Sequence, residues 1–138
     1  MKPVLLDTGA IVALLDKNER HHRSCLSALE AVAAPLVTCE AVITESCYLL
    51  RSLPGAPKAI LENVVAGTFQ IPFQLSRAAA HIQRVLRKYK DREVDFADAC
   101  LIHLANEFHS GEILTLDHDF EIYRWSVNKP FHLLIPLS

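Results

Sequence analysis

Short runs of apolar residues alternate along this chain with longer stretches in which apolar residues recur every three or four positions. A short unbroken run is typical of a buried strand, and the longer repeat is typical of an amphipathic helix. The predicted strands are residues 3–7, 35–39, 68–73, 112–117 and 131–136. The predicted helices are residues 8–17, 21–34, 40–53, 58–67, 76–90 and 95–111. We expect the last helix to stop at Gly111.

Strands and helices that alternate at this spacing favour right-handed crossovers and a parallel sheet with helices on both faces, which is an α/β fold. Pro72 in the third predicted strand suggests an edge position or the end of the strand. A strand order of 3-2-1-4-5 would place the first and fourth strands side by side. Ligands of such open sheets bind at the carboxyl ends of the strands, so polar residues there are the first candidates for function.

Composition supports a compact globular protein with one domain over residues 1–138, because 51% of the residues are hydrophobic and 22% are charged. The four cysteines lack the short spacing of a zinc site and are expected to be free thiols in a reducing compartment. Asp7 interrupts the first apolar run too early for a signal peptide, and no run approaches the ~20 apolar residues of a membrane span. We therefore expect a cytoplasmic protein without membrane contact.

Acidic residues stand where two of the predicted strands end. Asp7 closes the first strand and Asp117 closes the fourth, and Asp7 could simply cap a turn or the helix that follows it. Thr8 and Thr115 lie next to or near these acids, so their hydroxyls either bond a carboxylate or pack at the strand ends. For Asp119 we favour a role as N-cap of a short helix that follows it.

Two further acids lie on predicted helices. Glu45 shares a helix face with Val42 and Leu49, and a buried glutamate needs a partner or a cation; the alternative is that this face is solvated. Asp98 lies on the helix face directed at the sheet, in the first turn, where the helix dipole favours an anion. Asp95, one turn earlier, is interpreted as the cap of that helix.

Together these acids predict a metal site. In the strand order given above, Asp7 and Asp117 are neighbours, and Glu45 and Asp98 can reach in from flanking helices. Clustered carboxylates remain ionised together only if a cation neutralises them. Oxygen ligands select Mg²⁺ or Mn²⁺ over zinc and leave room for phosphate oxygens. The chemistry that follows is hydrolysis of a phosphodiester by metal-activated water.

Four segments of the chain resemble the PIN-domain ribonucleases, and in particular the VapC-type toxins of toxin–antitoxin pairs. They are VLLDTGAIVALLD near the start, TE at 44–45, DFADACLIHLA at 95–105 and ILTLDHDF at 113–120. The resemblance covers nearly the whole chain and implies a three-layer α/β/α fold with a central parallel sheet of about five strands. It also implies a Mg²⁺- or Mn²⁺-dependent endoribonuclease that acts on RNA, forms homodimers and is inhibited by a cognate antitoxin.

The resemblance also assigns the site residues. The four acids of the family match Asp7, Glu45, Asp98 and Asp117 as catalytic residues, with Asp7, Asp98 and Asp117 as metal ligands. His118 is the histidine that we would test as a proton shuttle, although hydrolysis by metal-activated water requires none. The alternative function is a catalytically weak PIN-fold module that binds RNA or a partner. A phosphatase with an aspartate nucleophile is disfavoured, because Gly9 stands where that class needs a second aspartate.

A basic group lies on and after the predicted helix 76–90. It comprises Arg77, Arg84, Arg87, Lys88, Lys90 and Arg92. Such a group can hold an RNA backbone, but a solvated helix surface is the commoner explanation and the one we prefer. The net charge of −2 argues weakly against capture of nucleic acid by the molecule as a whole.

Overall fold

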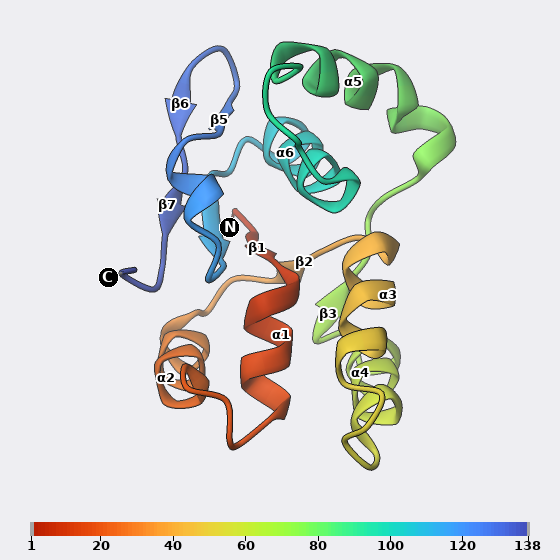
Figure 1. The fold of residues 1–138 in the computed structure, drawn as a ribbon, viewed down its shortest axis with the longest axis vertical. Coiled ribbons are helices and arrows are strands. Elements are labelled where there is room, and N and C mark those ends of the chain that lie inside the picture. The colour runs from red at the N-terminus through yellow and green to blue at the C-terminus, as the bar shows by residue number, and fades with distance from the viewer. Residues whose placement is uncertain (1, 138) are drawn as a thin grey trace.

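The computed structural model describes residues 2–137 and shows a parallel sheet flanked by helices (Figure 1). In the described residues, the strands of this sheet are β1 (Val4–Leu6), β2 (Leu36–Val37), β3 (Phe69–Gln70), β4 (Glu112–Leu114) and β7 (His132–Leu133). The helices are α1 (Thr8–Leu15), α2 (His22–Ala31), α3 (Glu40–Leu49), α4 (Ala56–Val65), α5 (Leu75–Lys88) and α6 (Phe96–Phe108).

The strand order of the sheet is β3-β2-β1-β4-β7, and each neighbouring pair is parallel. Leu5 of the central strand β1 pairs with Val37 on one side and with Ile113 on the other. The three residues of β1 are buried, as expected for a strand with helices over both faces of its sheet. The predicted order 3-2-1-4-5 is confirmed, with β7 in the place of the fifth predicted strand.

The segment after β4 differs from the prediction. Instead of a short helix that starts directly after Asp119, the chain forms the 3₁₀ helix η1 (His118–Glu121) and then strand β5 (Arg124–Trp125). β5 pairs antiparallel with β6 (Lys129–Pro130). Tertiary packing buries side chains of this segment, and Tyr123, for example, is 1% exposed. This packing, rather than local propensity, determines the secondary structure of the segment.

Two helix ends also differ from the prediction. α6 ends at Phe108 and is capped by His109, which adopts the left-handed conformation at φ 52°, so Gly111 is not the stop. Gly111 is required for another reason, because a Cβ there would lie 2.1 Å from Nε1 of Trp125. α4 begins at Ala56 with Pro57 in its first turn, where a missing N–H costs nothing. Within residues 2–137, no helix combines the length and the apolar character that crossing a bilayer requires.

Candidate functional site

Asp7 lies at the junction of β1 and α1 and is 6% exposed. Its backbone N–H continues the sheet by donating to the carbonyl of Leu114 at 3.0 Å. One carboxylate oxygen accepts from the N–H of Thr8 at 2.8 Å and caps α1, and the other accepts from the Thr115 hydroxyl at 2.7 Å. Asp7 therefore does act as a helix cap, and this bonding also fixes the direction in which its carboxylate points.

Asp117 is held by the same threonine. Its backbone N–H donates to Oγ1 of Thr115 at 3.0 Å, so Thr115 connects the ends of β1 and β4. The Asp117 carboxylate accepts from the N–H of Asp119 at 2.8 Å and caps η1. The interpretation of Asp119 as the cap is therefore wrong, because the turn starts two residues earlier than predicted.

Asp98 comes from the first turn of α6, and the chain starts this helix as predicted. Asp95 is the N-cap and accepts from the N–H of Ala97 at 3.3 Å. Asp98 itself is 6% exposed and lies on the buried face of α6 together with Leu101 and Ile102. Its carboxylate accepts from the hydroxyl of Tyr123 at 3.3 Å. The helical phase inferred from sequence thus correctly separated the capping acid from the inward-facing one.

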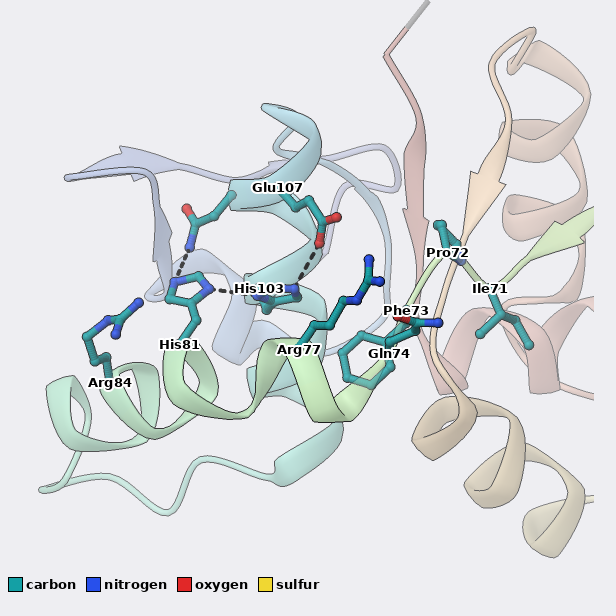
Figure 2. Close-up of a pocket in the computed structure, with 10 residues that line it drawn as sticks. Ile71, Pro72, Phe73, Gln74, Arg77, His81, Arg84, His103 and Glu107 are labelled. Carbon is teal, nitrogen blue, oxygen red and sulfur yellow. Dashed lines mark hydrogen bonds and ion pairs between the residues drawn. The ribbon is translucent and has the colours of Figure 1, made fainter.

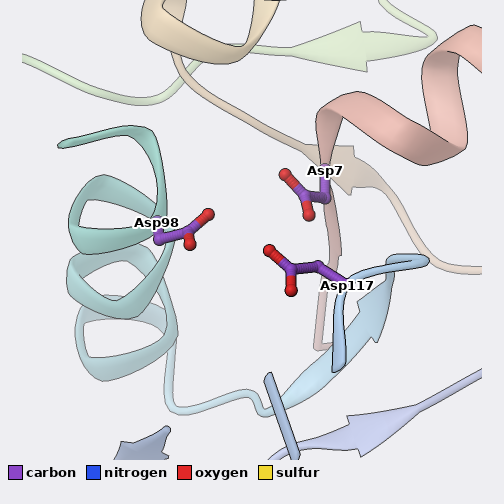
Figure 3. A group of neighbouring side chains, drawn as sticks. All are labelled: Asp7, Asp98 and Asp117. Atoms are coloured by element: carbon purple, nitrogen blue, oxygen red, sulfur yellow. The ribbon is translucent and has the colours of Figure 1, made fainter. Parts of the chain in front are cut away.

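The three aspartates converge. Figure 3 shows Asp7 from the end of β1, Asp98 from α6 and Asp117 from the segment after β4 directed at one space. One carboxylate oxygen of each lies within 4.8 Å of those of the other two. Pairing of β1 with β4 brings Asp7 next to Asp117 although 110 residues separate them in sequence, and the first turn of α6 supplies Asp98.

Burial and mutual repulsion shift the acidity of this group. Burial raises the pKa of Asp7 from 3.8 to about 6, helped by the charges of Asp117 and Glu45 and opposed by the hydrogen bonds from Thr115 and Thr8. Burial also raises the pKa of Asp98 to about 8, together with the charges of Asp7 and Asp117. Without a cation, the group cannot carry its full negative charge near neutral pH.

Glu45 lies near this group but outside it. Its charge contributes to the raised pKa of Asp7, yet the side chain is exposed and lines a shallow cleft beside Asp95 and Phe96. The predicted buried face of Val42, Glu45 and Leu49 is wrong, because only Val42 is buried and Leu49 is 55% exposed. Glu45 is instead exposed to solvent, which is the alternative that the sequence left open.

Three other residues lie at or near the site, and the sequence pointed to two of them, Thr115 and His118. The hydroxyl of Thr115 donates to the Asp7 carboxylate and accepts from the backbone N–H of Asp117. The sequence left open whether this hydroxyl bonds a carboxylate or only packs at the strand end, and the structure shows the hydrogen bond. Tyr123 was not found from sequence, since no local pattern connects it with Asp98, 25 residues away. His118 is exposed and bonds to Glu121 in its own turn.

Comparison with known proteins agrees with this geometry. The family model of the PIN domain matches residues 4–125. The chain belongs to the PIN-domain family. A relative of this PIN domain, Ribonuclease VapC26 of Mycobacterium tuberculosis (strain ATCC 25618 / H37Rv), is 28% identical over 116 residues, which are 83% of this chain and 86% of the relative.

A solved structure supports the fold of the PIN domain. The crystal structure of Mycobacterium tuberculosis VapC20, described as a sarcin-ricin loop cleaving toxin, superposes with a TM-score of 0.80. The match covers 92% of this chain and 99% of that one. Because the two sequences are 18% identical, this likeness establishes the shared architecture and leaves the activity to be argued from the site.

Proposed function

We propose that this PIN domain is a metal-dependent endoribonuclease that hydrolyses RNA phosphodiester bonds and acts as the toxin of a toxin–antitoxin pair. The observation that carries the proposal is the convergence within 4.8 Å of Asp7 and Asp117, which follow the adjacent strands β1 and β4, with Asp98 of α6. The relative VapC26, 28% identical, is named a ribonuclease, which supports RNA as the substrate.

The residues fit a divalent cation. Asp7, Asp98 and Asp117 offer only oxygen ligands, and such a set suits Mg²⁺ or Mn²⁺ better than zinc. Two of the three are buried with raised pKa values, a state that a cation would relieve. In addition, the buried hydroxyl of Thr8, next to Asp7, finds no hydrogen-bond partner within residues 2–137, as expected if a water or ion ligand satisfies it.

A divalent cation held by Asp7, Asp98 and Asp117 would supply Lewis-acid chemistry for hydrolysis of the phosphodiester. The chain's own residues position the ligands. Thr115 orients Asp7 by donating to its carboxylate and fixes Asp117 by accepting from its N–H. Tyr123 donates to Asp98 and limits its rotation. Glu45 is exposed and its charge acts on Asp7, so it would serve as the general base that accepts the proton of the attacking water.

The biological setting follows the VapC-type resemblance. We propose a cognate antitoxin and a second copy of this chain as protein partners, and cytoplasmic RNA as the substrate. Exposed apolar side chains on neighbouring helices α3 and α4 offer contact area for a partner; they are Tyr48, Leu49, Leu61 and Val65. We also propose that residues 1–138 form one domain, because the sheet pairs strands from both ends of the chain through β4.

The test is cleavage of structured RNAs by purified protein with Mg²⁺, with Mn²⁺ or with EDTA. We expect cleavage with either ion and none with EDTA, and a loss of at least about 100-fold in Asp7→Asn and Asp98→Asn. His118→Ala is the matched control and should cleave like the wild type, because His118 is exposed and bonded within its own turn. Cleavage that persists unchanged in Asp98→Asn would come from a contaminant. Tight RNA binding without product would favour the non-catalytic binding module.

A further inference from the structure

A groove between α5 and α6 lies outside the carboxylate group. Four side chains of α5 face it, at the spacing i, i+4, i+7 and i+11 that places residues on one side of a helix; they are Arg77, His81, Arg84 and Lys88. They line a cleft of about 860 Å³ and an adjoining smaller one of about 140 Å³, which share His81, Arg84 and Asn106. Figure 2 shows the larger cleft, with side chains of α5 extending toward α6.

The groove is positively charged although the chain has a net charge of −2. Arg77, Arg84 and Lys88 are exposed, and within residues 2–137 none of them forms an ion pair. Glu107 is the carboxylate that lines the described part of the groove, and it is bound to Nε2 of His103 at 2.9 Å. The cations are therefore free to bind an anionic ligand.

A chain of hydrogen bonds holds the two walls of the groove at a fixed spacing. The N–H of Ser126 donates to Oδ1 of Asn106, so the amide nitrogen of Asn106 donates to Nε2 of His81, at 3.1 Å. The N–H at Nδ1 of His81 then donates to Nδ1 of His103 at 2.7 Å, and Nε2 of His103 donates to Glu107. In this arrangement each ring accepts at one nitrogen and donates at the other.

The acidity of His81 agrees with this pattern. Burial, His103 and the charge of Arg84 lower the pKa of His81, so the ring stays neutral at pH 7. The hydrogen bonds of His81 to His103 and Asn106 of α6 therefore do not change with pH near neutrality. The shape of the groove is thus fixed by hydrogen bonds that connect α5, α6 and Ser126 in the loop after β5.

We propose that the α5–α6 groove binds the sugar–phosphate backbone of a single-stranded RNA segment adjacent to the cleavage position. Its cations extend over 11 residues of α5, or ~16 Å along the helix axis, which is several phosphates of one strand. Phe73 lines one end of the groove and offers a ring for base stacking. This inference rests on the proposed function in taking RNA as the ligand.

The groove is close to the carboxylates through two connections. α6 carries Asp98 at its start and Asn106 two turns later, which are ~12 Å apart along the axis. At the other end, Tyr89 lines the smaller cleft and packs edge-on against Tyr123, with ring centroids 5.3 Å apart. Tyr123 donates to Asp98. The groove and the carboxylate group thus share helix α6, with the buried Tyr123 between the smaller cleft and Asp98.

Binding and cleavage can be measured separately. We would follow the anisotropy of a fluorescein-labelled single-stranded RNA of about 12 nucleotides in EDTA, for wild type, Arg77→Gln, Arg84→Gln and the double variant. The control is Arg87→Gln, an equal charge change at an exposed residue of the same helix that lines neither cleft. Each lost phosphate contact should weaken binding about fourfold and reduce the salt slope by about 0.7.

The expected result is about sixteenfold weaker binding in the double variant, from two losses of about fourfold. Arg87→Gln should bind nearly like the wild type, and most of the affinity should return when both arginines are changed to lysine. Circular dichroism confirms that each variant is folded. Equal losses in Arg84→Gln and Arg87→Gln would overturn the proposal, because binding would then depend on net charge alone. Tighter binding of an oligoglutamate peptide than of RNA would also overturn it, since the groove would then serve a protein partner.

Failure of the groove proposal differs from failure of the proposed function. Metal-dependent cleavage with the same kcat/KM and affinity in wild type and in the double variant would overturn the groove and leave the nuclease standing. RNA binding that depends on Arg77 and Arg84, without cleavage under any metal condition, would overturn the nuclease and support the groove.

Discussion

Replacement of Asp98 by asparagine should stabilise the metal-free protein while removing its activity. The asparagine oxygen can still accept from the hydroxyl of Tyr123, which lies 3.3 Å from the present carboxylate. The substitution removes a charge that burial and the neighbouring Asp7 and Asp117 disfavour. A residue kept for structure alone would show the opposite behaviour, since its loss would destabilise the fold.

The magnitude follows from the acidity of Asp98. Its pKa rises from 3.8 to about 8 in the folded chain, so the carboxyl stabilises the folded state at low pH, and this contribution is lost as the pH rises from about 4 through 8. At about 1.4 kcal/mol for each tenfold change in acidity, the loss reaches at most about 6 kcal/mol. Screening by water at the 6% exposed carboxyl lowers the expected gain for Asp98→Asn to about 2–5 kcal/mol.

Urea denaturation in EDTA at about pH 8.5 measures this gain. The matched control is Asp91→Asn, an exposed acid, which should change the free energy of unfolding by less than about 0.5 kcal/mol. Added Mn²⁺ should narrow this difference by up to about 2.7 kcal/mol, because an ion at 100 times its Kd stabilises the wild type by about 2.7 kcal/mol and the variant by less. An Asp98→Asn protein less stable than wild type in EDTA at high pH would refute the reasoning.

Three further predictions follow from single residues. Because burial raises the Asp7 pKa to about 6, the metal-free protein should lose roughly 3 kcal/mol of stability as the pH rises from about 4 to above 6; a profile without such a decline in urea titrations would contradict this. Gly111→Ala should lower Tm by several degrees, since its Cβ would lie 2.1 Å from Trp125 Nε1, whereas Gly9→Ala meets its nearest neighbour at 3.5 Å and should be neutral in the same melting assay. Glu45→Gln should slow cleavage by at least about tenfold without changing Tm, because the side chain is exposed; equal cleavage rates would exclude it as general base.

Much of the fold could be predicted because the local pattern and the tertiary structure agree. The apolar run that ends at Asp7 and the one that ends near Asp117 read as strands, and parallel pairing of β1 with β4 brings their carboxyl ends together. Helical phase then selects Asp98 over Asp95 as the inward-facing acid. These three aspartates were identified from sequence because strand ends and helix faces are properties of short segments.

The remaining features depend on contacts between residues far apart in sequence. The bond from Thr115 to Asp7 spans 108 residues, and the His81–His103 pair spans 22. The register of β4 determines the first and the packing of α5 on α6 determines the second, and neither is specified by local propensity. Burial of Glu45 was predicted wrongly for the same reason, because the neighbours of α3 decide which of its faces is covered.

The central claim is that Asp7, Asp98 and Asp117 together hold one or more divalent cations. Anomalous diffraction from crystals of the wild-type protein grown with Mn²⁺ tests it most directly. The account predicts anomalous density within bonding distance of carboxylate oxygens from all three aspartates, and its loss in crystals of Asp98→Asn. A wild-type crystal whose manganese binds elsewhere, with these carboxylates turned apart, would contradict it.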